Sequence, residues 1–181
     1  MQYIALLRGI NVGGKNKVSM SDLKVCFEKA GFQSILTYIN SGNVIFESEE
    51  SDIVKLVNQC AGILQKEFGF PISVAVINVD NLQDALEHAP EWWGEDPDAK
   101  HNAIFVIPPA TADEVTIEAG QIKPEYEKIH VHGEIIFWSA PLTTFSRTRW
   151  SKIVGTKAYQ HITIRNANTT RKLLELAMSL K

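Results

Sequence analysis

The chain has 181 residues, of which 45% are hydrophobic and 22% are charged, a composition typical of a globular protein and not of a disordered or fibrous one. No stretch reaches the roughly 18 unbroken apolar residues that a membrane span needs, and the N-terminal segment MQYIALLRGI lacks the features of a secretion signal. We therefore expect a cytosolic protein with no membrane partner.

Charge is distributed unevenly along the chain, although the formal net charge is only −3. Residues 135–174 contain seven lysines and arginines and no acidic residue, whereas residues 80–98 contain seven acidic residues and no basic one. Two interpretations stay open. The two segments face each other or are simply solvated, or the basic segment forms a surface for a partner that carries phosphate or carboxylate.

The first half of the chain predicts a β-α-β-β-α-β order. Its expected elements are a strand at 3–8, a helix between the Ser19–Asp22 capping box and Gly31, strands at 35–39 and 44–46 around a tight turn, a helix at 53–68 and a strand at 72–79. This order indicates a ferredoxin-like unit, an antiparallel four-stranded sheet with two helices on one face. Its first strand is central and apolar at every position from 3 to 7, so we expect it to be covered on both sides.

The second half repeats this order loosely, with an extra helix at each end. Its expected elements are a helix capped by Asp80, an acidic loop at 91–98, a strand at 102–107, a helix behind a Thr111–Glu114 capping box, a hairpin of strands 127–131 and 134–138, a helix around 149–154, a strand at 162–165 and a closing helix that carries Leu173 and Leu180. We therefore predict an α+β protein with a ferredoxin-like subdomain at 1–79 and a second α+β subdomain at 80–181, packed on the first.

The residues that could form a disulfide or bind a metal are few. Cys26 and Cys60 each fall on the apolar stripe of a predicted helix, where buried structural thiols are expected. His130 and His132 lie two residues apart at the end of a predicted strand and face the same way, as two metal ligands would, but neither a cysteine nor a third histidine stands beside them in the sequence. We therefore predict no metal and no other cofactor.

The most unusual segment is RGINVGGKNK at residues 8–17, which comes directly after a predicted strand. Residues 9–15 match G-x-x-x-x-G-K, the first seven positions of a P-loop. However, Asn16 stands where a hydroxyl group should bind magnesium, and the next helix starts near Ser19 instead of at the Gly-Lys pair. The segment therefore does not indicate a nucleotide-hydrolysing P-loop.

A simpler anion site remains compatible with this segment. Backbone amides around Gly13 and Gly14 can form a concave nest for an oxyanion, and Arg8, Lys15 and Lys17 add positive charge. The alternative interpretation is a glycine turn that only reverses the chain.

Three further segments combine residue types that hold anions. The turn at 40–43 could line a site, although a hairpin alone explains its residues. Residues 145–152 mix arginines with Trp150, a combination that binds phosphates and stacks bases, or they form a solvated helix start with Trp150 in the core. Residues 165–172 end a strand and open a helix whose N-cap is Asn166 or Asn168, flanked by cations. The candidate anion ligands are Arg8, Asn11, Gly13, Gly14, Lys15, Lys17, Asn40, Ser41, Gly42, Asn43, Arg147, Arg149, Lys152, Arg165, Asn166 and Asn168.

Three strings, the first near the N-terminus and the last near the C-terminus, carry a family resemblance: YIALLRGINVGGKNKVSMSDLK from residue 3, ILTYINSGNVIF from residue 35 and ITIRNANTTRKLLELA from residue 162. They resemble the bacterial family catalogued as domain of unknown function 1697. The resemblance implies one architectural unit with a ferredoxin-like N-terminal half, and it carries over no activity, substrate or catalytic residue. The chain has Ser19 and Ala167 where the family usually has a proline and an aromatic residue, and the second departure weakens any role for base stacking there.

Three functional hypotheses are consistent with these patterns. The first is a binding protein for a phosphate-bearing ligand, either a small molecule such as a nucleotide or an RNA bound through the basic loops, because residues 43–47 lack the aromatic RNA-binding signature. The second is an enzyme acting on a small anionic metabolite, in which Arg8 and Lys15 share a pocket with the turn at 40–43 and with Ser41 or Tyr38. The third is a protein-interaction or homo-oligomeric module, which predicts an exposed apolar sheet face.

Overall fold

The computed structural model describes residues 1–180, which divide into two compact units. The first unit comprises Met1–Leu82 together with the C-terminal residues from Leu173 onward, and the second comprises Gln83–Lys172. Each unit contains one four-stranded antiparallel sheet, so the predicted α+β class is confirmed. No helix among residues 1–180 combines the length and the apolar character needed to cross a membrane.

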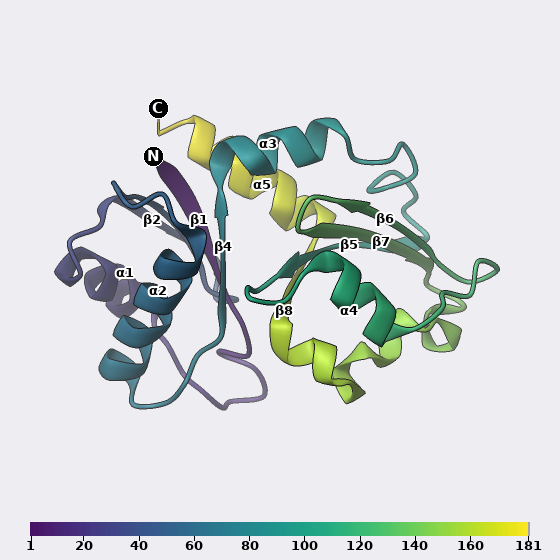
Figure 1. Ribbon diagram of the computed structural model, residues 1–181, viewed down its shortest axis with the longest axis horizontal. Coiled ribbons are helices and arrows are strands. Elements are labelled where there is room, and N and C mark those ends of the chain that lie inside the picture. Colours follow the sequence, from purple (N-terminus) through teal and green to yellow (C-terminus); the bar gives the residue numbers. More distant parts are fainter. Residues whose placement is uncertain (181) are drawn as a thin grey trace. The chain divides into compact units, whose positions relative to one another are not determined.

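The first unit has the predicted β-α-β-β-α-β order (Figure 1). Its elements are β1 (Gln2–Leu7), α1 (Met20–Lys29), β2 (Gln33–Tyr38), β3 (Asn43–Glu47), α2 (Ile53–Phe68) and β4 (Val74–Asn78). The strand order in the sheet is β2-β3-β1-β4, which places β1 and β3 in the centre as expected. Both α1 and α2 lie on the same face of this sheet (Figure 1).

The uninterrupted apolar run of β1 corresponds to a strand that is buried along its whole length. Residues 3–7 are at most 1% exposed, which confirms the expectation of cover on both sides. Ala5 pairs with Val44 of β3 and with Val76 of β4, so both edges of the strand are hydrogen-bonded. A strand in this position has no solvated face, and polar alternation is therefore absent.

An aromatic cluster fills the space between the first sheet and α1. The ring of Phe46 lies 4.6 Å from that of Phe32 and 5.4 Å from that of Phe27, measured between centroids. Cys26 and Cys60 are buried and unpaired, as the sequence predicted. The apolar stripes predicted from the helix periodicity are therefore the stripes that form this core.

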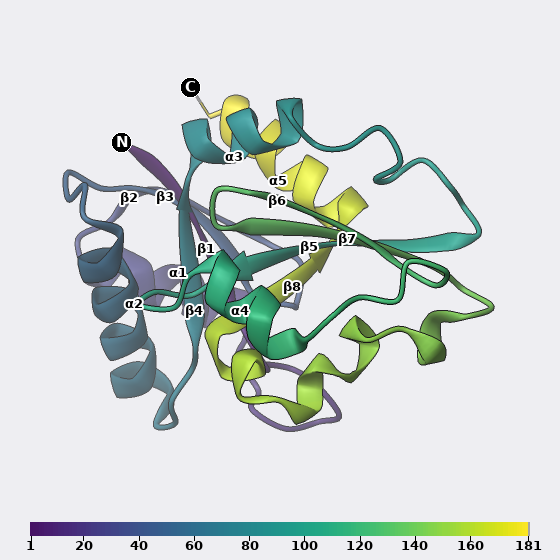
Figure 2. The same cartoon turned by 45° about the vertical axis from the view of Figure 1, so that its right-hand side comes forward.

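The second unit has the same strand topology as the first. Its elements are α3 (Val79–Glu87, which begins in the first unit), β5 (Ala99–Val106), α4 (Ala112–Ala119), β6 (Lys128–His132), β7 (Ile135–Pro141), the 3₁₀ helices η1 (Phe145–Arg147), η2 (Trp150–Gly155) and η3 (Lys157–His161), β8 (Ile162–Asn166) and α5 (Ala167–Met178, which belongs to the first unit from Leu173 onward). The sheet order is β6-β7-β5-β8. One face packs against α4 and the 3₁₀ helices around the buried Trp138 and Trp150 (Figure 2).

One local prediction is confirmed only in part and another is wrong. The helix expected around 149–154 is present as the 3₁₀ helix η2, in a run of 3₁₀ helices; the hydroxyl groups of Thr148, Ser151 and Thr156 each donate to a carbonyl oxygen three residues earlier and so compete with α-helical bonding. The helix attributed to an Asp80 cap begins at Val79. Asn78 Oδ1 accepts from the Asp80 amide at 2.8 Å and so caps the first turn.

Candidate functional site

The Gly-rich loop after β1 is a tight reversal at its tip. The Lys15 amide donates to the Val12 carbonyl at 3.0 Å, and the two residues between them have positive φ angles of 58° at Gly13 and 76° at Gly14. Two consecutive positive φ angles define a type I′ turn, which glycine adopts at little cost. The glycine pair is therefore required for chain reversal. Among residues 1–180, nothing accepts a hydrogen bond from the amides of Gly13 and Gly14.

The base of this loop is held by the side chain of Asn11. Its amide nitrogen donates to the carbonyl oxygens of Val18, at 2.8 Å, and Asn40, at 2.9 Å, while its Oδ1 accepts from the Val18 amide at 2.9 Å. Asn11 itself has a φ of 56°, a conformation that asparagine tolerates better than most residues. One carboxamide thus joins the loop to the start of α1 and to the turn between β2 and β3.

The turn at 40–43, between β2 and β3, is closely packed against its neighbours. The Gly42 carbonyl accepts from the Leu7 amide at 2.8 Å, and a Cβ atom at Gly42 would lie 2.5 Å from Ile10 Cδ1. Asn43 is buried and donates to the Tyr38 carbonyl at 2.8 Å and to Ser41 Oγ at 3.1 Å. Ser41, Gly42 and Asn43 therefore shape the turn and position its neighbour Asn40.

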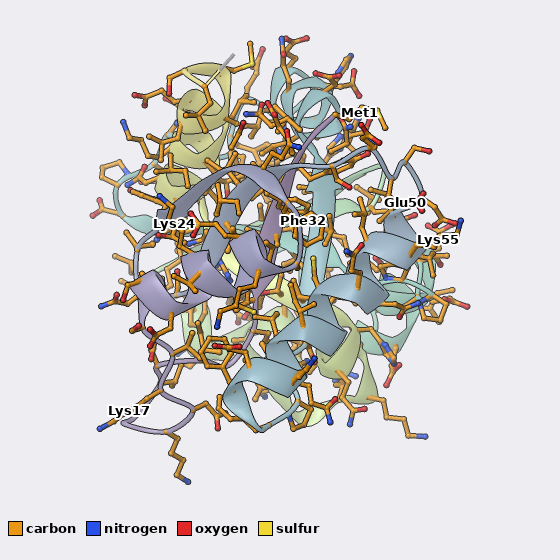
Figure 3. All side chains as sticks on the ribbon, turned by 90° about the vertical axis from the view of Figure 1, so that its left-hand side faces the viewer. Met1, Lys17, Lys24, Phe32, Glu50 and Lys55 are labelled. Atoms are coloured by element: carbon orange, nitrogen blue, oxygen red, sulfur yellow. The ribbon has the colours of Figure 1, made fainter. Side chains whose placement is uncertain are left out.

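The loop, the turn and the N-terminus of α1 border an open hollow of about 580 Å³, which we call the loop hollow. Its lining residues are Asn11, Gly14, Lys17, Val18, Ser19, Asp22 and Asn40. Four candidate residues from the sequence are thus brought together: Asn11, Gly14, Lys17 and Asn40. Figure 3 shows Lys17 on a loop that projects past the helices, with its side chain directed away from them.

The N-terminus of α1 contributes its own polar groups to the loop hollow. Ser19 is the N-cap, and its Oγ accepts from the Asp22 amide at 3.0 Å. The other amides of a first helical turn have no intrahelical acceptor, and they give this end of the helix a partial positive charge. The carboxylate of Asp22 also lines the hollow and opposes an anion there.

Arg8, the cation at the start of the loop, contacts Ser73 and does not line the loop hollow. The backbone amide of Arg8 donates to the Ser73 carbonyl at 2.9 Å, and its guanidinium Nη2 lies 3.2 Å from Ser73 Oγ. Neither Arg8 nor Lys15 is among the described residues that line the loop hollow. The enzyme hypothesis, which requires both cations in a pocket with the 40–43 turn, gains no support from this arrangement.

The basic candidates of the second unit are dispersed over several elements. Arg149 Nε donates to the Ala119 carbonyl at 2.6 Å, and the guanidinium of Arg147 lies 5.8 Å from the ring centroid of Tyr126. Lys152 is exposed on η2. Arg171, which lies in the same basic segment, pairs with Glu95 at 3.0 Å, so the acidic and basic segments meet at least there.

Arg165, Asn166 and Asn168 have distinct roles at the junction of β8 and α5. Arg165 is 7% exposed and its Nη1 donates to Thr163 Oγ1 at 3.0 Å; this burial lowers the pKa of the guanidinium to about 10. Asn166 Oδ1 accepts from the Thr169 amide at 2.7 Å and thus caps α5. Asn168 is exposed in the first turn.

A second cavity, of about 240 Å³, lies within the second unit and was not predicted. Trp92, Tyr126, His101 and Ser139 are among its lining residues. His101 Nδ1 lies 2.6 Å from Ser139 Oγ, and His101 Nε2 lies 2.8 Å from the carbonyl oxygen of Asp96. The carbonyl can only accept, so Nε2 carries the proton and Nδ1 is left to accept from the serine hydroxyl.

A buried carboxylate beside this cavity was also missed. Glu127 is 2% exposed and accepts hydrogen bonds from the backbone amides of Lys123, Arg149 and Trp150 and from Trp138 Nε1. Four donors on one carboxylate satisfy both of its oxygens. Only the tertiary structure brings these donors together, and the sequence around Glu127 contains no signal of them.

Comparison with known proteins places the chain among proteins of similar length and fold. The family model described as "Protein of unknown function (DUF1697)" matches residues 1–137. Among solved structures, the conserved bacterial protein SP0830 from Streptococcus pneumoniae is 31% identical, with a TM-score of 0.86 over 99% of this chain and 98% of that one. No curated protein matches the chain.

Proposed function

The chain belongs to the family described as "Protein of unknown function (DUF1697)", and for this member we propose a binding function in which the loop hollow holds a phosphate group or a comparable oxyanion. The observation that carries the proposal is the set of unbonded amide groups at Gly13 and Gly14, next to a hollow that Gly14 and Lys17 both line. Backbone amides presented by a glycine turn are a recurrent means of holding oxyanions.

Electrostatics supports an anion over a neutral ligand. Lys15 and Lys17 are exposed, and neither forms an ion pair with another residue in the described part of the chain. The N-terminus of α1 adds positive potential to the hollow, because Ser19, the N-cap of this helix, lines it. Asp22 opposes these groups and limits the affinity, which favours a multiply charged ligand such as a diphosphate.

The openness of the hollow favours a phosphate at the end of a larger molecule. Candidates of this class are a nucleotide and the phosphate-bearing end of an RNA. The free, buried thiols of Cys26 and Cys60 fit a reducing compartment, and we place the activity in the cytosol.

Thermal denaturation with inorganic pyrophosphate, a nucleoside triphosphate and a short 5′-phosphorylated RNA tests the proposal. A bound ligand should raise the Tm by mass action, and Lys17→Ala should remove most of that increase. Lys24→Ala is the matched control, because Lys24 is an exposed lysine of α1 that is paired with Glu28 and does not line the hollow (Figure 3). Equal Tm increases in the wild type and in Lys17→Ala would contradict the proposal.

The dependence of these Tm increases on salt concentration distinguishes the two ligand classes, a small diphosphate and an RNA. RNA binding through several phosphates should weaken steeply as salt rises, whereas a single diphosphate should show a much shallower dependence. A Tm increase with RNA alone, and none with pyrophosphate or the nucleotide, would assign the hollow to RNA.

The His101–Ser139 pair favours a second candidate function, acyl transfer in the cavity of the second unit. Ser139 Oγ attacks an ester carbonyl while its proton passes to His101 Nδ1; the imidazolium then protonates the departing alkoxide, and water later releases the acyl group. Turnover of p-nitrophenyl acetate should be lost in Ser139→Ala and in His101→Gln, and retained in His161→Gln as a matched exposed histidine. Turnover that survives Ser139→Ala would exclude this candidate.

A further inference from the structure

Three side chains of the types that bind metals lie together in the second unit, outside both cavities described above. Asp84 is in α3, His88 lies just after the end of that helix, and His132 ends β6. One potential ligand atom from each of these residues lies within 4.8 Å of the other two. We call this group the 84/88/132 cluster.

The local structure explains why these residues meet. The His88 amide donates to the Asp84 carbonyl at 3.1 Å, so the two side chains have the i, i+4 spacing of one helical face. The end of α3 lies beside β6 in both views of the ribbon (Figures 1 and 2). His132 Nε2 consequently reaches Asp84 Oδ2 at 2.7 Å.

The two imidazole rings are aligned with each other. Their centroids are 4.9 Å apart and their planes differ by 10°. His88 Nδ1 lies 3.4 Å from Asp84 Oδ1, so Asp84 offers one oxygen to each histidine. His88 Nδ1 also lies 2.8 Å from the Asp84 carbonyl oxygen, which restricts the orientation of its ring.

The donor spacings match a metal site. Bonds of about 2.0–2.1 Å to nitrogen and oxygen place neighbouring donors about 2.9–3.4 Å apart in octahedral or tetrahedral geometry. The two imidazole–carboxylate separations, 2.7 Å and 3.4 Å, bracket this range. Both of these nitrogens face an oxygen acceptor, so an ion takes the place of their protons and the stacked rings turn until each directs a lone pair at it.

The chemistry of the donors defines the class of ion. Two imidazoles and one carboxylate suit Zn²⁺, Co²⁺ and Ni²⁺ better than Mg²⁺ or Ca²⁺, which prefer oxygen ligands throughout. Asp84 and His88 are more than half exposed, which leaves room for water or an external ligand on the ion.

We propose that Asp84, His88 and His132 form a binding site for one divalent transition-metal ion of the Zn²⁺ class, with open coordination positions toward solvent. The site is independent of the loop hollow and of the His101–Ser139 pair. It involves one of the two histidines that the sequence suggested, His132, joined to a partner from α3 in place of His130.

Calorimetric titration of the full chain without a histidine tag, with Zn²⁺ and separately with Co²⁺, tests this site. One ion should bind per chain, and His88→Ala, His132→Ala and Asp84→Asn should each weaken binding at least about tenfold. His130→Ala is the matched control, because His130 lies on the same strand two residues before His132 and outside the cluster. No binding by the wild type, or unchanged binding by His132→Ala, would overturn the proposal.

A second measurement uses only the wild-type protein, so it tests the site even where a substituted protein does not fold. In the wild-type protein, ¹⁵N–¹H correlation spectra of the imidazoles should show the nitrogens of His88 and His132 shifting when Zn²⁺ is added, while those of His130 and His161 stay in place. Shifts confined to other histidines would assign the ion elsewhere and reject the cluster as its site.

Discussion

The side chain of Asn11 donates to the backbone carbonyl of Asn40 across 2.9 Å and so links two turns that are 29 residues apart in the chain. Together with its two bonds to Val18, this contact holds the Gly-rich loop against the N-terminus of α1. The shape of the loop hollow therefore depends on one carboxamide.

Asn11→Gly should test this dependence without adding backbone strain, because glycine adopts the positive φ of this position freely. Loss of the three hydrogen bonds should lower the free energy of unfolding by about 1–3 kcal/mol, measured by urea denaturation. It should also weaken pyrophosphate binding, because the hollow loses its fixed wall.

The matched control is Asn16→Gly. Asn16 also has a positive φ, but its side chain donates a single hydrogen bond, to the Gly9 carbonyl at 3.1 Å, within the described part of the chain. Its loss should cost about 1 kcal/mol or less. Equal destabilisation by the two variants would show that the Asn11 carboxamide has no special role.

Gly42→Ala should be among the most destabilising single-methyl changes in the first unit. The new Cβ would lie 2.5 Å from Ile10 Cδ1 and 2.9 Å from Leu7 Cβ, at a φ of 79°. Overpacking and the left-handed backbone together should cost about 2–4 kcal/mol. Gly14→Ala, with a φ of 76° and no atom within 4 Å of the new Cβ, should cost only about 1–2 kcal/mol. Thermal denaturation compares the two, and the reverse order would refute the packing argument.

Glu127→Gln should destabilise the second unit although it changes the side chain very little. The carboxylate accepts from four donors, and a glutamine presents an NH₂ group to some of these N–H groups. We expect a loss of about 1–3 kcal/mol in urea denaturation. Glu125→Gln, at an exposed position nearby, should stay within about 0.5 kcal/mol of the wild type. A neutral Glu127→Gln would mean that the four donors are readily satisfied in another way.

The buried thiols should ionise at a higher pH in the native protein than in the unfolded chain. Burial raises the pKa of Cys60 to about 12 and also raises that of Cys26. Since an unfolded cysteine ionises at a pH of about 8.5, Cys60 stabilises the fold fully below that pH, and the contribution is lost progressively as the pH rises towards 12.

Reaction with a thiol reagent measures this difference. At pH 9, Cys60 should react slowly in the native protein and fast in urea, and the Cys26→Ala variant isolates its rate. A native rate close to the unfolded rate would show that Cys60 is accessible as a thiolate, against its burial in the fold.

Much of the fold could be predicted because its elements carry local signals. The apolar run of β1, the Ser19 cap and the helical stripe of α2 each predicted an element that the structure confirms. Within the 3₁₀ run from Phe145 only the helix around 149–154 was predicted, and its 3₁₀ type was not, since hydroxyl groups that bond backwards to the main chain do not alter the apolar pattern.

The candidate site was less predictable from the sequence, because it depends on tertiary contacts between the loop at 8–17 and the turn at 40–43. Asn11, Gly14, Lys17 and Asn40 were named from their residue types, and the structure brings them to one hollow. The pairing of His101 with Ser139 results from the register of β5 and β7, and that of Asp84 with His132 results from the packing of α3 beside β6. No spacing within either segment encodes these pairs.

The two sheets share one strand topology but differ in the length of the connection after their first strands. Residues 8–19 separate β1 from α1, whereas only residues 107–111 separate β5 from α4. None of residues 8–19 is needed for strand pairing in the first sheet. Under the proposed function, substitutions in residues 8–19 can therefore change which anion the loop hollow binds while the strand register of the first sheet stays the same.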